Sequence, residues 1–468
     1  MISILIVMVI PGLLMDGMFM DGEQYACISA NLYNNIGSFW KPILSQTWYM
    51  KTSPYFMEQP PLFYWLESSM FYLFADSEYS ERMFSILMLI INAVIIHKLW
   101  KLVFLTHENL IQKSWLPLFL WIITPICFWT FQNNMIEMVV SAFCLLAVYF
   151  GYSALVNNKF RYFKFLLAGC MIVLGFLTKG FPAFFPVVML LAYYFSFKTI
   201  TLKQAVLYSF YLISVIVILL LCIVFSSNEA YDYFHFYIIE RLLDRLEATA
   251  TTNYRILLIV DLISELIPAF AITVLFFAFE KMSFFKLTFS PLFRFFLILG
   301  LAGSLPLMLT LVQKKFYFMP SIPFFAMALS VLIVSNSKGV LINYLNTEKR
   351  KKVVHGAVVF LFFLSIVLSA CSVGKYSRDE KIIADVKTIG VYLKTTSVIS
   401  TDINTHNDWS FNFYLLRKFK ISLDPNIKRS NYFVSSNTNF PNSFYNNYSK
   451  VNIPTLRYHL FITRGLNN

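Results

Sequence analysis

Acidic and basic side chains recur at the ends of strongly apolar segments of this chain. Asp21 ends the first apolar segment, Glu58 lies in the polar stretch that follows, and Glu137 precedes a later apolar segment. In such places a carboxylate can act as a general base, and a cation can stabilise a departing phosphate. Because ionisable groups near a membrane interior are costly, they are usually functional. The cations in comparable places are Arg82, Lys179, Arg241, Lys314 and Lys315.

Asp21 is the leading candidate for the base, because Gln24-Tyr25-Ala26 follows it at the expected lipid–water boundary. Asp16, in a similar Met-Asp-Gly context, is its rival. Alternatively, Asp21 only ends one helix and caps the next. Glu137 is either a helix N-terminal acid, which the helix dipole favours, or a group that orients the acceptor or binds a sugar amine. Asp21 and Glu137 are also the candidates for a divalent metal, although the sequence carries no metal signature.

The cations leave two interpretations open. Lys179 lies between two apolar segments and either extends to lipid headgroups or binds phosphate. Lys314 and Lys315, just before Tyr317, likewise either extend to lipid headgroups or bind phosphate. Arg241 and Arg245 are one helical turn apart, so the segment from His235 is either an interfacial helix or a positive face over a phosphate. His235 itself is expected to be structural or interfacial.

Composition identifies the scaffold that must position these groups. The 468 residues are 58% hydrophobic and 13% charged, whereas soluble domains have about 45–50% apolar and about 25% charged residues. The chain is therefore a polytopic membrane protein, and its net charge of +13 reflects basic cytoplasmic loops rather than nucleic-acid binding. The six cysteines include no C-x-x-C pair and are expected to be packing residues.

Eleven apolar runs are long enough, or nearly so, to span a membrane, and 62–75 is a further candidate, which gives about 11–13 helices. The first run lacks a basic n-region, so we expect an uncleaved helix rather than a signal peptide. Thr178-Lys179-Gly180 separates two short runs, which predicts two helices that meet at one membrane face. The runs are 2–20, 83–105, 115–131, 135–156, 163–178, 180–197, 205–225, 257–279, 292–312, 316–335 and 353–372.

The distribution of Lys and Arg predicts the orientation. Short alternate loops carry 16 of the 38 basic residues, which places the N-terminus in the cytoplasm. Eleven spans then place 373–468 outside, and the candidate residues all fall on the outer face. We expect a transmembrane domain 1–372, with its first outer loop at 21–82, and an extracytoplasmic domain 373–468. Apolar residues at helical spacing in 378–395 and a strand at 397–400 predict that this second domain is a small α/β domain.

The first 90 or so residues resemble the family 39 type glycosyltransferases, which are membrane enzymes of the C-type glycosyltransferase fold. The nearest pattern is that of the bacterial branch related to the lipid A aminoarabinose transferase and the protein mannosyltransferases. The resemblance continues weakly through Leu177-Thr178-Lys179-Gly180 and from Tyr317 to Pro323. The motifs that carry it are Asp21 with Gln24-Tyr25-Ala26, Gly37-Ser38-Phe39-Trp40, Tyr55-Phe56-Met57-Glu58-Gln59-Pro60-Pro61-Leu62, and Glu81-Arg82.

The resemblance implies a multi-pass enzyme of the bacterial cytoplasmic (inner) membrane whose active site and C-terminus face the periplasm. It would move a sugar from a polyprenyl-phosphate donor to a lipid, glycan or protein acceptor, with inversion. Asp21 occupies the catalytic aspartate position, and Glu58 lies in the Glu-x-Pro-Pro motif. Gln59 replaces a lysine that helps to hold the donor phosphate in that branch, and Gly22 replaces an acid. A transporter or flippase of lipid-linked sugars and a non-catalytic envelope-assembly subunit remain as alternatives. Membrane lipids are expected partners and nucleic acid is not.

Overall fold

The computed structural model of the chain describes residues 1–48, 53–242, 254–282, 288–309, 312–339, 347–393, 396–426 and 430–464, with the backbone alone for 240–242. The chain forms two compact units. Unit 1 comprises Met1–Leu13, Glu58–Phe63 and Ser85–Val373, and unit 2 comprises Leu14–Met57, Tyr64–Phe84 and Gly374–Asn468. This division differs from the expected boundary at 372, because most of the first outer loop packs with the C-terminal segment.

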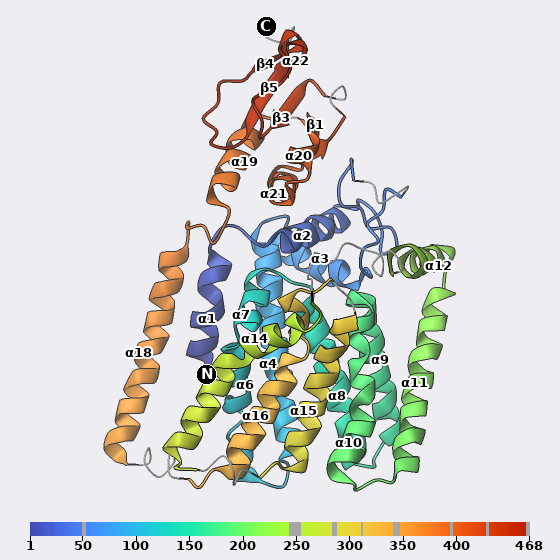
Figure 1. Ribbon diagram of the computed structural model, residues 1–468, viewed down its shortest axis with the longest axis vertical. Coiled ribbons are helices and arrows are strands. Elements are labelled where there is room, and N and C mark those ends of the chain that lie inside the picture. Colours follow the sequence, from blue (N-terminus) through green and yellow to red (C-terminus); the bar gives the residue numbers. More distant parts are fainter. Residues whose placement is uncertain are drawn as a thin grey trace. The chain divides into compact units, whose positions relative to one another are not determined.

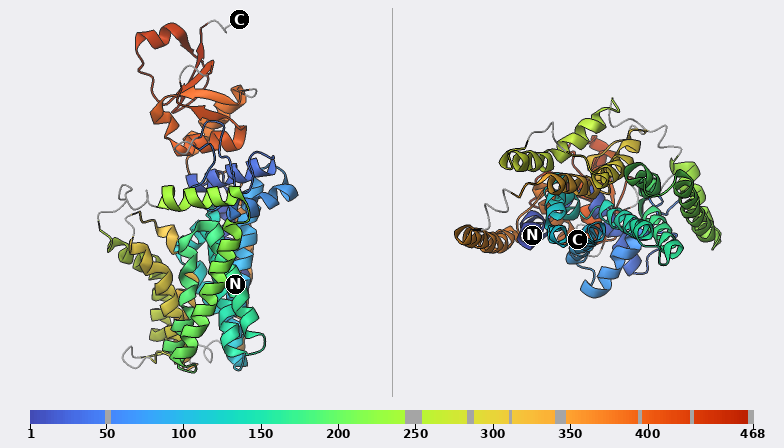
Figure 2. Two further views of the ribbon diagram at one scale, coloured as in Figure 1. Left: turned by 90° about the vertical axis from the view of Figure 1, so that its right-hand side faces the viewer. Right: turned by 90° about the horizontal axis from the view of Figure 1, so that it is seen from below.

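Unit 1 is a bundle of helices that run roughly along one direction (Figure 1), and most of them are seen end-on in the second view of Figure 2. Its elements are α1 (Ile2–Leu14), α4 (Tyr79–Val103), α5 (Glu108–Ile111), α6 (Trp115–Ile122), α7 (Pro125–Gln132), α8 (Glu137–Val156), α9 (Arg161–Lys179), η1 (Phe181–Val188), α10 (Met189–Phe197), α11 (Leu202–Val224), α12 (Asn228–His235), η2 (Phe236–Leu242), α14 (Leu257–Phe279), α15 (Pro291–Ser304), η4 (Leu305–Leu309), η5 (Lys315–Phe318), α16 (Ile322–Asn336) and α18 (Glu348–Ser372). The first residues of α4, up to Phe84, belong to unit 2.

The described residues contain 7 helices that are long and apolar enough to cross a membrane. An eighth candidate is the pair Glu108–Ile122 and Pro125–Gln132, which is bent by 77°. Three shorter apolar helices, Ile2–Leu14, Phe181–Phe197 and Ile322–Asn336, account for the other predicted runs. Every predicted run therefore contains helix and the multi-pass character is confirmed, but hydropathy alone did not reveal which helices are short or broken.

Local sequence explains where several helices begin and break. Thr201 caps α11, and the Gln204 side-chain oxygen accepts a hydrogen bond from the Thr201 backbone N–H at 2.9 Å, which completes a capping box. Pro125 begins α7 after the bend, where its missing N–H costs no helical hydrogen bond. α9 ends at Lys179 because Gly180 has φ +85°, a conformation that side chains disfavour. The predicted junction of two helices at Thr178-Lys179-Gly180 is thereby confirmed.

Unit 2 combines helices of the first outer loop with a small α/β fold. The sheet order is β2-β1-β3-β5-β4; β1 pairs in parallel with β2 and β3, whereas β5 pairs antiparallel with β3 and β4. The helix predicted within 378–395 and the strand predicted at 397–400 are both present, as α19 and β1. The elements are α2 (Met20–Tyr33), α3 (Leu62–Phe74), α19 (Glu380–Tyr392), β1 (Val398–Thr401), α20 (Ile403–His406), α21 (Trp409–Phe419), β2 (Ser422–Asp424), β3 (Tyr432–Ser435), α22 (Asn442–Asn447), β4 (Tyr448–Lys450) and β5 (His459–Thr463).

The core of the α/β fold lies between the sheet and helices α19 and α21. Phe411 of α21 stacks on Tyr458, with ring centroids 3.8 Å apart, and both side chains are fully buried. Ile383 of α19 and Leu460 of β5 belong to the same cluster. One face of α21 is thus fixed by this core, which leaves other side chains of the helix to contact the first outer loop.

Candidate active site

Asp21 lies in the first turn of α2, together with Glu23. Negative charge is favourable there, because the helix N-terminus carries partial positive charge. The Asp21 side chain is half-buried. The loop that leads into α2 is held by Arg82, whose guanidinium donates to the carbonyl oxygens of Met15 and Gly17 at 3.3 and 3.2 Å. Arg82, a predicted phosphate ligand, therefore contacts the backbone that precedes the candidate base.

Asp16, the rival of Asp21, is an ion-pair residue within unit 2. Its carboxylate accepts from Lys387 at 2.8 Å and from Lys418 at 3.1 Å. Burial opposes ionisation, but the hydrogen bonds and charges of these two lysines lower the pKa of Asp16 below its usual value. Asp16 thus links the loop before α2 to the C-terminal helices.

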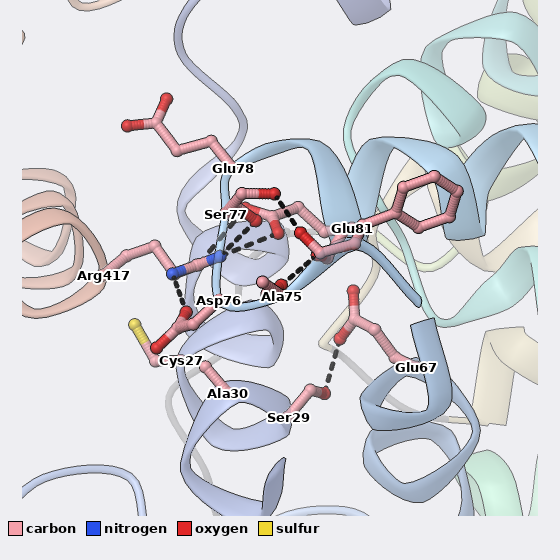
Figure 3. Close-up of polar contacts among 12 residues, drawn as sticks. Cys27, Ser29, Ala30, Glu67, Ala75, Asp76, Ser77, Glu78, Glu81 and Arg417 are labelled. Carbon is pink, nitrogen blue, oxygen red and sulfur yellow. Dashed lines mark hydrogen bonds and ion pairs between the residues drawn. The ribbon is translucent and has the colours of Figure 1, made fainter. Parts of the chain in front are cut away.

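Figure 3 shows an ion cluster centred on Arg417 of α21. The Arg417 guanidinium donates to Asp76 at 2.8 Å, to Glu81 at 3.2 and 3.0 Å, and to the Ser77 carbonyl at 2.8 Å. Its side chain is 3% exposed, and the charges of Glu81 and Asp76 outweigh burial and raise the pKa of Arg417. Sequence reasoning missed this residue, and its only sequence signals were the acidic run that precedes α4 and the adjacent Lys418.

Glu23 is a buried acid that the sequence analysis also missed. Its side chain is 4% exposed, and its Oε2 has no hydrogen-bond partner among the residues that the structure describes. Burial and the charge of Glu81 raise the pKa of Glu23 to about 8, against the opposing charges of Lys418, Arg82 and Arg417. Glu23 is therefore protonated at neutral pH.

Tyr25, a predicted site residue, is a packing residue of α2. It is 1% exposed, and its ring lies 5.9 Å from that of Tyr64 on α3. Tyr64 in turn lies edge-on to Phe56, 6.0 Å away. This aromatic group fixes α2 against α3 within unit 2 and thereby supports the helix that carries Asp21.

Glu58 and Gln59 belong to unit 1. Both are half-buried, and the backbone carbonyl of Gln59 accepts a hydrogen bond from the Tyr233 hydroxyl at 2.5 Å. Pro60 and Pro61 follow, and α3 begins directly after them, as expected because proline disfavours a helical conformation in the residue before it. The Glu-x-Pro-Pro motif is thus a fixed junction that is held from α12.

Glu137, Lys179 and Tyr317, all predicted site residues, are brought together in unit 1. Glu137 is the first residue of α8 and Lys179 the last of α9, and their side chains form an ion pair. Glu137 is fully buried, and Lys179 is 10% exposed. The Lys179 ammonium lies 4.6 Å from the centroid of the Tyr317 ring and 5.6 Å from that of Phe316. This is a desolvated cation held by a carboxylate and aromatic rings.

Lys315, in contrast, is placed beside carboxylates on α14. Its ammonium lies 3.2 Å from Asp261 and 3.9 Å from Glu265, and its side chain is 49% exposed. Glu265 also accepts from the backbone N–H of Ile126, at 2.9 Å. Lys315 and Glu265 line a mostly apolar cavity of 320 Å³. Lys314 is exposed.

His235 is the last residue of α12, and Arg241 lies near the end of η2. His235 is exposed, and its ring lies 6.1 Å from that of Tyr231. The Arg241 backbone belongs to η2, but its side chain lies outside the described residues, as does Arg245 altogether. The predicted role of Arg241 and Arg245 at a phosphate therefore lies outside the described residues.

A metal centre was one of the expectations for Asp21 and Glu137. Within the described part of the chain, no three His, Cys, Asp or Glu side chains cluster as metal ligands. Glu137 is already paired with Lys179. The described residues thus show a buried lysine ammonium held by a carboxylate more clearly than a set of metal ligands.

Comparison with known proteins identifies the fold. Residues 58–225 match the family described as dolichyl-phosphate-mannose-protein mannosyltransferase. The solved structure of ArnT from Cupriavidus metallidurans bound to undecaprenyl phosphate is similar at a TM-score of 0.67 and 12% identity, over 98% of this chain and 96% of that one. The apo structure of the same protein gives 0.64 at 12% identity, over 98% and 95%. No curated protein sequence matches the chain. The fold class expected from the sequence is thereby confirmed.

Proposed function

We propose that this chain, a member of the superfamily of membrane glycosyltransferases with the C-type fold, moves a sugar from a polyprenyl-phosphate donor to an acceptor outside the cytoplasm. The acceptor is a lipid, a glycan or a protein. The observation that carries the proposal is the buried Glu137–Lys179 pair with Tyr317, a desolvated cation suited to the phosphate of such a donor. The fold match to a protein bound to undecaprenyl phosphate supports this choice of donor.

In this proposal Asp21 is the general base. Its carboxylate takes the proton from the acceptor hydroxyl or amine as that atom bonds to the anomeric carbon. The bond between the anomeric carbon and the phosphate oxygen breaks, and polyprenyl phosphate leaves with the electron pair. Attack opposite the leaving group inverts the anomeric carbon. The neighbouring Glu23 holds its own proton at neutral pH, so it does not compete as a base.

Lys179 stabilises the departing phosphate. A preorganised cation in a site with little water is worth more than the same cation in solution. Glu137 fixes the direction of the ammonium, and the face of Tyr317 limits its movement. Lys314 and Lys315, which are exposed, and Arg82, which binds the backbone before α2, are weaker candidates for the same phosphate. Glu58 orders the acceptor from the Glu-x-Pro-Pro junction.

The same proposal assigns the protein to the bacterial inner membrane, with the site and the C-terminal α/β fold facing the periplasm. The basic cytoplasmic loops and the kind of donor support this orientation. A site on the outer face has no access to cytoplasmic nucleotide sugars, so a lipid-borne donor is required.

Reconstituted protein distinguishes transfer from transport. Proteoliposomes receive a polyprenyl-phosphate sugar labelled in the sugar, together with extracted envelope lipids, glycans or proteins. We expect the label to appear in an acceptor fraction while unlabelled polyprenyl phosphate accumulates in equal amount. Movement of intact labelled donor between the leaflets, without cleavage, would instead identify a flippase and contradict the proposal. Lipid bilayers that lack the protein provide the control.

A further inference from the structure

Helix α12 and the π-helix η2 connect two motifs of unit 1 that are far apart in the sequence. Two tyrosines one turn apart, Tyr233 and Tyr237, point from one face of this segment and are 1% and 4% exposed. Tyr231, on the opposite face, is 47% exposed. Residues four apart on a helix lie on the same side, so the two buried hydroxyls face the same part of the unit.

The Tyr233 hydroxyl reaches the Glu-x-Pro-Pro motif. It donates to the carbonyl oxygen of Gln59 at 2.5 Å, across 174 positions of sequence. Burial and the neighbouring Tyr237 and Glu58 raise the pKa of Tyr233 well above its usual value, so the hydroxyl keeps its proton and stays a donor.

The Tyr237 hydroxyl reaches the Lys179–Gly180 motif. A Cβ built on Gly180 would lie 2.1 Å from this oxygen, so the tyrosine lies directly against the glycine. Gly180 has φ +85° and immediately follows Lys179. Phe234 adds a second attachment, because its ring stacks on Phe176 of α9 with centroids 6.1 Å apart and an interplanar angle of 13°.

We propose that Tyr233 and Tyr237 are positioning residues that hold the Gln59 and Lys179 motifs in a fixed relation for donor binding. The inference rests on the proposed function, because it takes Lys179 as the cation for the donor phosphate. Gln59 stands where the resembling branch has a lysine that helps to hold that phosphate. A contact that links these two motifs therefore acts first on donor binding.

Tyr233→Phe removes the hydrogen bond and keeps the ring. We expect the KM for the polyprenyl-phosphate sugar to rise about threefold to tenfold, which is the usual effect of one buried hydrogen bond. The donor KM should change more than kcat and more than the acceptor KM. Tyr231→Phe, the same change on the exposed face, is the matched control and should match the wild type. Tyr237→Phe, which removes the oxygen that contacts Gly180, should raise the donor KM in the same selective way.

Hydrogen–deuterium exchange tests this link between the motifs without any activity. In Tyr233→Phe we expect faster exchange in the peptide that covers 58–63, and in Tyr237→Phe in the peptide that covers 176–183, with no change in Tyr231→Phe. Unchanged exchange and kinetics in both variants would overturn the proposal, as would an equal fall in all kinetic parameters with a lower melting temperature. If the wild type transfers no sugar, the proposed function is wrong. The exchange result still tests whether Tyr233 and Tyr237 hold the two motifs.

Discussion

Arg417 of α21 binds both carboxylate oxygens of Glu81 at the start of α4, at 3.2 and 3.0 Å, although 336 positions separate the two residues in the chain. The same guanidinium binds Asp76 at 2.8 Å. This pairing makes the C-terminal α/β fold and the first outer loop one compact unit. The helix that carries Asp21 therefore belongs to the same folded body as the C-terminal segment.

Arg417→Met should strongly destabilise unit 2. The change leaves Glu81 and Asp76 without their buried cation, and breaking a buried ion pair typically costs about 3–5 kcal/mol. Arg457→Met is the matched control, because its side chain is 53% exposed beside Asp408 and such surface pairs contribute at most about 1 kcal/mol. Thermal unfolding of the purified proteins measures both. Equal melting temperatures for the two variants would show that the Arg417 cluster does not stabilise the fold.

Glu23 makes stability depend on pH. In the folded chain it keeps its proton up to about pH 8, whereas its ordinary pKa is 4.5. Between these values the folded state binds more protons than the unfolded state, so stability falls as pH rises, by at most about 1.4 kcal/mol per pH unit. Glu23→Gln abolishes this term, so its stability relative to the wild type should increase from pH 5 to pH 8.

The measurement is a series of melting curves at several pH values for wild type, Glu23→Gln and Glu380→Gln. Glu380 is exposed and provides the same chemical change without burial. Curves of melting temperature against pH that run parallel for wild type and Glu23→Gln would contradict the assignment of a protonated Glu23.

Gly180→Ala should disturb the end of α9. The backbone at φ +85° is nearly restricted to glycine and costs about 1–3 kcal/mol with a side chain, and the new methyl group would overlap the Tyr237 hydroxyl. Gly356→Ala in α18 is the control, because no atom lies within 4 Å of its added methyl and alanine favours helix. We expect a lower melting temperature and reduced transfer for Gly180→Ala alone. A Gly180→Ala protein that melts with the control would show that this turn tolerates a side chain.

Substitutions at the Lys179 site should reduce transfer by different amounts, with the largest loss for Lys179 itself. Lys179→Met removes the cation and should lower kcat by about 10²–10³-fold, as the loss of one preorganised charge-stabilising group does elsewhere. Glu137→Gln keeps the side-chain shape but loses the ion pair with Lys179. We expect kcat to fall about tenfold, the usual effect of losing one charged hydrogen bond. Lys159→Met, at an exposed position, should be neutral. Labelled-sugar transfer measures all three, and a Glu137→Gln protein less active than Lys179→Met would contradict the order.

Some of these relations were predictable and others were not. Every apolar run found by hydropathy contains helix, and Lys179 and Glu137 were recognised because each stands at the end of an apolar run. The spacing of apolar residues also predicted helix α19, and strand β1 was predicted at 397–400. The Arg417–Glu81 and Tyr233–Gln59 contacts have no local pattern, because long-range pairing depends on the packing of distant elements. The carboxylates that hold Lys315 were missed because Asp261 and Glu265 lie inside a run that reads as an ordinary spanning helix.

The central claim is that Asp21 is the base, and transfer by Asp21→Asn tests it most directly. The variant is compared with wild type and with Asp232→Asn, the same change at an exposed position. We measure transfer of labelled sugar and, separately, binding of polyprenyl phosphate. The account predicts that Asp21→Asn loses about 10²–10⁴-fold in transfer with binding retained. Transfer by Asp21→Asn at the rate of the wild type would contradict it.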